Sequence, residues 1–440
     1  MKKQISLKDT VMIVLVTLIG IVCSVVFNFL LFFGFLPGFI FLYYVCIRKG
    51  YTYTEIGKSA LVGLLKTKEV ILILLLVGLL LPSWQIAGTI TGMVEVILSF
   101  INPSFFYVSA FISTLVVSMI LGTSVGTLSA IGIPIIAAAV SIGMSVEIAA
   151  GALVSGAFVG DRTSPFSSAN QLLSNTLEIE RKPFQRILWK TGFVACVASI
   201  LFFFIQDILI DSQPLSSVKT ELEANVIVMF PLLVLILLAL LKIKIRTCFI
   251  VSIAVALVII YSYQRIPLEF QFLWNGTQES GGGLRKMIPL VAFIGLAGAY
   301  NGIIEKFQVF QLLLTKWLGT KTSLYTMTWK TMVATLFISL LACNQTLPII
   351  LTGRTFLPDW TKNHQREQLA RVMADSSMLF AGMIPWSVLA IMCSTVLGVS
   401  LFTYLPFAIL LWCLPILTLS YSFWLRKEAV KSNVRESVSK

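Results

Sequence analysis

A short polar stretch at residues 160–170 carries side chains that are able to do chemistry. It reads Gly-Asp-Arg-Thr-Ser-Pro-Phe-Ser-Ser-Ala-Asn and follows an apolar run, residues 148–159, that contains no charge. Pro165 lacks a backbone donor and disfavours helix at the residue before it, so we expect a helix to break near Ser164. Carboxylate, hydroxyl and amide oxygens suit hard cations. The oxygen donors offered here are those of Asp161, Thr163, Ser164, Ser167 and Asn170.

The composition places this stretch inside a membrane protein. The chain has 440 residues, of which 57% are hydrophobic and 12% are charged, whereas about a quarter of a soluble protein is charged. Apolar stretches recur along the whole sequence without the alternation of a β-barrel. We therefore expect an all-α polytopic membrane protein, one unit over residues 1–440, with roughly 10 to 13 transmembrane segments. The first apolar segment is expected to be an uncleaved span rather than a signal peptide.

The net charge of +13 is best explained by basic cytoplasmic loops. Lys58, Lys66, Lys182, Lys244 and Arg426 are expected on the cytoplasmic side, together with a tail at residues 425–440. Acidic residues at 207–223 suit an external loop. Because the basic residues are spread over short loops, no nucleic acid is expected as a partner.

Cofactor and enzyme chemistry find little support in the sequence. The seven cysteines form no Cys-x-x-Cys pair, and the single histidine, His364, lies in a polar segment. No His-Glu-x-x-His motif is present, and no second histidine is available as a general base. We therefore expect no bound cofactor and no enzyme activity; any bound ion would be transported.

A second segment, residues 122–134, is apolar enough for the membrane yet rich in glycine and hydroxyl side chains. Small residues allow helices to pack closely, which explains the composition about as well as a functional role does. The functional interpretation is a broken or re-entrant segment whose oxygens line a site. Its candidate ligands are Thr123, Ser124 and Thr127.

The polar interruptions recur in two predicted halves, residues 10–205 and 226–424. In the second half, Asn344 and Gln345 precede a proline, and Asp375 is followed by Ser376, Ser377 and, ten residues after the aspartate, another proline. Paired interruptions in two halves of a membrane protein indicate a transporter site. We expect Asn344, Gln345 and Asp375 to lie near Asp161 at mid-membrane depth. The alternative places Asp375 near the membrane surface, after a polar loop at residues 354–371.

The predicted chemistry is competition for one carboxylate. A sodium ion would bind at Asp161, Thr163 and Ser164, with neutral oxygens completing its shell. A buried carboxylate holds either a proton or a cation, but not comfortably both, and this competition is the basis of antiport. Alternatively, Arg162 is the charge partner of Asp161, and the pair only fixes a helix break.

The chain resembles the NhaC-type sodium/proton antiporter family at these residues. Residues 160–167 match its Gly-Asp-(Lys/Arg)-x-Ser-Pro-Leu-Ser pattern, and residues 122–127 resemble its Gly-Thr-Ser-Trp-Gly-Thr segment. Asp375-Ser376 and residues 384–386 resemble its second-half elements. The resemblance implies a secondary transporter with inverted repeats and broken helices, of the ion-transporter superfamily type. This chain departs from the pattern at Ser168, where the family commonly has a carboxylate, and at Val125 and Ser387.

Two functions from different substrate classes follow. The first is a sodium/proton antiporter in the plasma membrane, with the lipid bilayer, sodium ions and protons as its partners. The alternative is a sodium- or proton-coupled carrier of an organic acid or amino acid, with its carboxylate held at the helix ends near Pro165 and Pro385. A homodimer is compatible with either function.

Overall fold

The computed structural model describes residues 5–100, 103–209, 226–241, 243–265, 270–276, 282–318 and 323–438, with side chains except at 97–100, 181, 318, 363 and 426–438. Every regular element in these ranges is a helix. Nine of the described helices are long and apolar enough to cross a membrane, or up to eleven if each bent pair forms one span. The prediction of an all-α polytopic membrane protein is confirmed. The acidic segment at residues 210–223 and the side chain of Arg426 lie outside the description.

The helices fall into three groups along the chain. The N-terminal helices are α1 (Leu7–Val26), α2 (Leu31–Arg48), α3 (Tyr53–Lys66), α4 (Lys68–Ile86) and α5 (Thr89–Phe100). The first candidate site region comprises α6 (Phe106–Leu121), α7 (Ser124–Thr127), a π-helical turn (Leu128–Gly132), α8 (Ile133–Ser141), α9 (Val146–Thr163), α10 (Ser168–Thr176) and α11 (Arg181–Leu209). The remaining helices are α12 (Val226–Leu240), α13 (Ile245–Ser262), α14 (Phe270–Asn275), α15 (Leu284–Phe307), α16 (Gln311–Leu318), α17 (Leu324–Ala342), α18 (Thr346–Asn363), α19 (Arg366–Ala374), α20 (Ser377–Met383), α21 (Val388–Leu397), α22 (Leu401–Tyr404) and α23 (Ile409–Val438).

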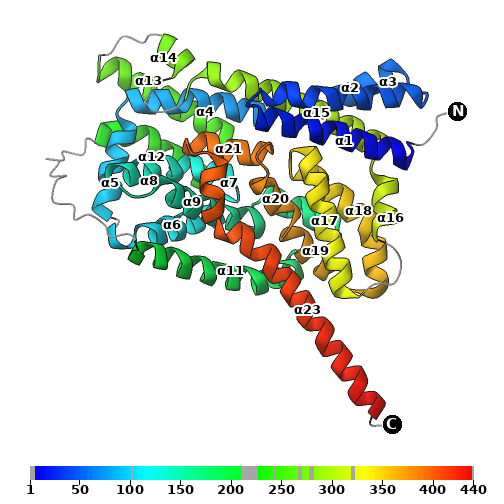
Figure 1. The fold of residues 1–440 in the computed structure, drawn as a ribbon. Coiled ribbons are helices and arrows are strands. Elements are labelled where there is room, and N and C mark those ends of the chain that lie inside the picture. Colours follow the sequence, from blue (N-terminus) through cyan, green and yellow to red (C-terminus); the bar gives the residue numbers. More distant parts are fainter. Residues whose placement is uncertain are drawn as a thin grey trace.

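Helices α1, α2 and α15 lie side by side along one face of the molecule (Figure 1). The segment after α2 forms α3, which packs on α15 through glycines. A Cβ at Gly63 would meet the backbone of Gly298 and Gly302, so the two helices approach at backbone distance. Helix α15 is continuous through Tyr300 and Asn301 to Phe307.

The first break in the chain follows α6. Gly122 adopts a left-handed conformation, φ +71°, that favours glycine, and ends the helix. Thr123 then caps α7 by accepting a hydrogen bond from the amide of Gly126. The chain continues through the π-helical turn into α8. Residues 122–134 are therefore a broken helix, as the functional interpretation of this segment requires, although the same glycines also serve close packing.

The second break follows α17. Cys343 takes a left-handed conformation, φ +56°, which is unusual for a residue with a side chain, and α18 begins at Thr346. The predicted polar loop at 354–371 is wrong, because these residues form most of α18 and the start of α19. The polar residues lie on one face of each helix. The other face is buried, as Trp360 of α18 and Leu369 of α19 show.

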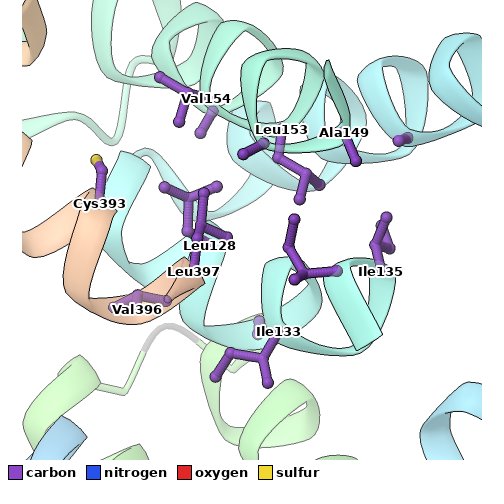
Figure 2. Packing of buried hydrophobic residues seen from close by; sticks show 14 of the residues in the cluster. Leu128, Ile133, Ile135, Ala149, Leu153, Val154, Cys393, Val396 and Leu397 are labelled. Atoms are coloured by element: carbon purple, nitrogen blue, oxygen red, sulfur yellow. The ribbon is translucent and has the colours of Figure 1, made fainter. Parts of the chain in front are cut away.

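The middle group, α6 to α11, is called the first region below, and helices α17 to α21 are called the second region. The two regions share their hydrophobic packing. Leu128 of the π-helical turn lies beside Leu397 of α21, below the apolar face of α9 that presents Leu153 and Val154 (Figure 2). A Cβ at Gly132 would come within 2.8 Å of Leu397. A helix from the C-terminal region is thus packed against the broken segment of the first region, which brings distant polar interruptions together.

Candidate functional site

Each region contains a pair of helix breaks that contact each other. Helix α9 ends at Ser164, whose ψ of 134° is extended, and Ser167 caps α10. Helix α20 ends at Ile384, whose ψ of 121° is also extended, and α21 follows from Ser387. In both turns the amide of the serine donates to the carbonyl three residues earlier, at 3.1 Å and 2.9 Å. The helix break predicted near Ser164 is confirmed.

In both regions the break that contacts the proline-containing break is also of the same kind. Gly122 packs against the backbone of Phe166 and Ser167 in the first region. In the second, the carbonyl of Cys343 accepts a hydrogen bond from the amide of Val388 at 2.7 Å. Each proline-containing break therefore lies against a break with a left-handed residue. This geometry aligns Pro165 with Pro385, so Asp161 and Asp375 do not occupy equivalent positions as the sequence pattern suggests. The inverted orientation of the halves stays a prediction.

Two glycines hold α9 against α6. A Cβ at Gly156 would lie 2.7 Å from the carbonyl oxygen of Phe111, and one at Gly160 would clash with the carbonyl of Ser118. Ser118 Oγ donates to the carbonyl of Gly156 at 2.8 Å and accepts from the amide of Gly160 at 3.1 Å. The glycine before Asp161 thus permits the contact that fixes the depth and direction of the carboxylate.

The Asp161 carboxylate lies where the two regions contact each other. Asp161 is 5% exposed. Ser124 Oγ donates to Asp161 Oδ2 at 3.0 Å, and the side chain of Gln345 interacts with the same carboxylate. Cys393 of α21 lies near the Asp161 carboxylate. The structure thus brings Ser124 and Gln345, which the sequence separates by more than two hundred residues, to one acidic group.

Most of the other predicted oxygen donors bond to the backbone around this carboxylate. Ser167 Oγ donates to the carbonyl of Asp161 at 2.5 Å, Ser164 Oγ to Met119, and Asn170 Nδ2 to the carbonyl of Arg162. A hydroxyl that donates keeps lone pairs to accept or to bind a cation. Internal helix bonds or caps hold Thr127, Ser376, Ser377 and Asn344. They support the breaks, and within the described part of the chain no hydrogen bond joins them to the carboxylate.

Arg162 does not pair with Asp161. Its Nε donates to Asp375 Oδ1 at 2.5 Å, and its Nη2 donates to Thr191 Oγ1 and to the carbonyl of Leu188. Consecutive residues on a helix point about 100° apart, so Asp161 and Arg162 face different neighbours. Thr163 Oγ1 accepts a longer bond from Arg162 Nη1, at 3.4 Å. The expectation of an Asp161–Arg162 pair is corrected by this geometry.

Asp375 is completely buried and saturated by donors. Besides Arg162, Thr191 Oγ1 and Thr418 Oγ1 donate to its Oδ2 at 2.9 Å and 2.5 Å. These hydrogen bonds join α9, α11, the end of α19 and α23, and Arg371 lies near Asp375. Asp375 therefore lies in the interior, as the shared-site prediction requires, but as an ion-paired group next to the Asp161 site rather than an open ligand.

Asn301 of α15 was not predicted as a site residue, yet it is buried, with 8% of its surface exposed. Its Nδ2 donates to the carbonyl of Ala342 at 2.7 Å, directly at the break between α17 and α18. Its Oδ1 is buried without a partner among the described residues, and so is Oε1 of Gln345, three residues after Ala342. Two amide oxygens at one helix break are therefore left without a hydrogen bond, which normally carries a cost. A polar amide directly after the apolar residues 287–300 was the signal that the sequence offered.

Residues 122–126 also fit the Gly-x-Ser-x-Gly spacing of hydrolase nucleophiles, but Ser124 lacks the required setting. That motif needs a strand-to-helix turn and a histidine base. Ser124 instead starts a helix and donates to Asp161, and the single histidine caps the end of α18. The serine belongs to the carboxylate site.

A polytopic helical protein with paired helix breaks beside a buried carboxylate has the architecture of a secondary transporter. The sequence matches the Na+/H+ antiporter family over residues 184–424, and the chain belongs to that family. It is 27% identical to the Malate-2H(+)/Na(+)-lactate antiporter of Bacillus subtilis over 386 residues, covering 82% of each chain. It is also 27% identical to the Na(+)/H(+) antiporter NhaC of the same organism over 398 residues, covering 85% of this chain and 88% of the relative. The Arginine/ornithine antiporter ArcD of Halobacterium salinarum is 23% identical over 388 residues, covering 81% of this chain and 79% of the relative.

Proposed function

We propose that this protein exchanges sodium ions for protons across the plasma membrane, and that Asp161 carries both in turn. The observation that carries this proposal is a buried carboxylate without a basic partner. Among the described residues no ion pair involves Asp161, and the neighbouring Arg162 pairs with Asp375 instead. An isolated carboxylate out of water is strongly disfavoured unless it binds a proton or a cation. Asp161 can satisfy this requirement with either ion, but not readily with both.

The neutral groups around Asp161 are hard oxygens, which suit sodium. Ser124 Oγ contacts the carboxylate, and the Oε1 of Gln345 and the Oδ1 of Asn301 are buried acceptors at the break beside it. In the proposed cycle, sodium binds to the deprotonated carboxylate and draws on these oxygens. When a proton arrives from the other side, it neutralises Asp161 and the sodium ion leaves.

Exchange of an organic acid is the second candidate, because one relative is named as a malate and lactate antiporter. Purified protein in liposomes with an internal pH dye distinguishes the two functions. We expect an external sodium pulse to move protons without any organic solute, and labelled malate to stay outside. Sodium-induced proton movement that requires malate or lactate on the opposite side would reject simple sodium/proton exchange.

A further inference from the structure

A basic pocket lies at the start of α11, and none of its lining residues belongs to the Asp161 site. It has a volume of about 420 Å³ and is lined by Lys182, Arg186, Lys190, Gln365 and Glu367, with Pro183 and Ile187 between them. The three basic residues follow one another at intervals of four and so lie on one face of the helix. They bring three positive charges against the single negative charge of Glu367.

The basic side chains of this pocket have no counter-ion within the described part of the chain. Each of them is exposed, and none takes part in an ion pair, whereas the nearby Arg366 pairs with Glu178. Helix α19 adds to the positive field, because it begins at the pocket and its cap residue, Gln365, forms no side-chain cap. Free backbone amides at a helix start favour an anion. The pocket therefore has the charge of an anion site.

The surroundings indicate where that anion comes from. Beyond the basic turn, α11 becomes apolar and belongs to a candidate membrane span, Lys182–Leu209. Trp189 is 51% exposed and Phe193 is 63% exposed, so the face next to the pocket is aromatic and open. Exposed tryptophan next to basic residues at the end of a span is typical of the headgroup level of a bilayer. An anion here would sit above acyl chains lying on the apolar face.

We propose that this pocket binds the phosphate headgroup of an anionic phospholipid, with its acyl chains along the exposed apolar face of α11. Basic pockets between helices at the membrane surface suit such headgroups. A lipid here would contact both α11 and the start of α19, which lead to Thr191 and Asp375 respectively. Its binding would therefore stabilise the packing of these two helices.

Native mass spectrometry of the detergent-solubilised protein tests this proposal, with phosphatidylglycerol and cardiolipin titrated against phosphatidylcholine. In the variant Lys182→Gln/Arg186→Gln/Lys190→Gln, we expect anionic lipid to bind roughly tenfold more weakly or worse. The matched control is Lys58→Gln/Lys244→Gln/Lys316→Gln, which removes the same charge from exposed sites elsewhere. Its lipid binding should equal that of the wild type.

A second pair of measurements separates lipid from a soluble anion and binding from misfolding. Lys182→Arg/Lys190→Arg should keep wild-type lipid binding, since the charge is retained. Inorganic phosphate at millimolar concentration should not displace the lipid. Equal lipid binding by the triple variant and the wild type would overturn the proposal, as would displacement by phosphate alone. Equal loss in the control variant would show a general charge effect and would also overturn it.

Discussion

Removing the charge of Asp375 should destabilise the protein more than any surface substitution. Arg162 and Asp375 are 1% and 0% exposed, and Asp375→Asn leaves the guanidinium without a counter-ion in the interior. Breaking a buried pair by removing one partner costs about 3–5 kcal/mol. Thr191 and Thr418 would each also lose a charged acceptor. We therefore expect Asp375→Asn to lower the free energy of unfolding by about 3–5 kcal/mol.

Unfolding by a denaturing detergent in mixed micelles, followed by tryptophan fluorescence, measures this loss. Arg162→Met should cost a similar amount, and the double variant Arg162→Met/Asp375→Asn should cost clearly less than the two single losses added together, because neither charge is then left alone. Asp359→Asn is the matched control. It breaks an exposed pair with Lys362 and should change stability by less than about 1 kcal/mol. Additive losses in the double variant would refute a direct buried pair.

Three further results are expected. Gly160→Ala should lower the free energy of unfolding by about 1–3 kcal/mol, because its Cβ would collide with the carbonyl of Ser118. Gly57→Ala, with open space around the added Cβ, should leave it unchanged, and equal stability of the two variants in the unfolding assay would contradict the close α6–α9 contact. Asn301→Leu removes an amide oxygen and leaves the Ala342 carbonyl unpaired, so it should raise the sodium concentration for half-maximal exchange in vesicles about tenfold or more. An unchanged sodium dependence would show that Asn301 is not part of the site. A cysteine at Lys244 should react with impermeant reagent only from the cytoplasmic side, and labelling from outside would reverse the assigned topology.

The sequence predicted the parts of this site that break helices. Proline at positions 165 and 385 restricts the backbone before it, and the glycine at 122 tolerates the left-handed conformation that ends a helix. The ends of α6, α9 and α20 could therefore be expected from local chemistry alone. The membrane class followed from composition for the same reason: it is a property of residues rather than of contacts.

The partners of the charged groups could not be read in this way. Arg162 follows Asp161 in the chain, but its counter-ion is Asp375, 213 residues away. Which of two neighbouring side chains meets which distant helix depends on the packing of α9 against α6 and α19. Asn301 was missed because its importance lies in a bond to the backbone of α17. The polar segment at 354–371 was misjudged because hydropathy reports which side of a helix meets water and says little about whether a helix forms.

The proposed exchange requires Asp161 to carry sodium and protons alternately. Asp161→Asn keeps the size of the side chain and its bond to Ser124 but removes the charge. The neutral oxygens that remain cannot offset desolvation of a cation, which costs several kcal/mol. The direct measurement is dye-reported proton flux in proteoliposomes after a sodium pulse, with folding checked by gel filtration and thermal unfolding. Asp161→Asn should be folded and show no sodium-dependent flux, while the wild type shows it. Wild-type flux from folded Asp161→Asn protein would show that Asp161 does not carry the two ions.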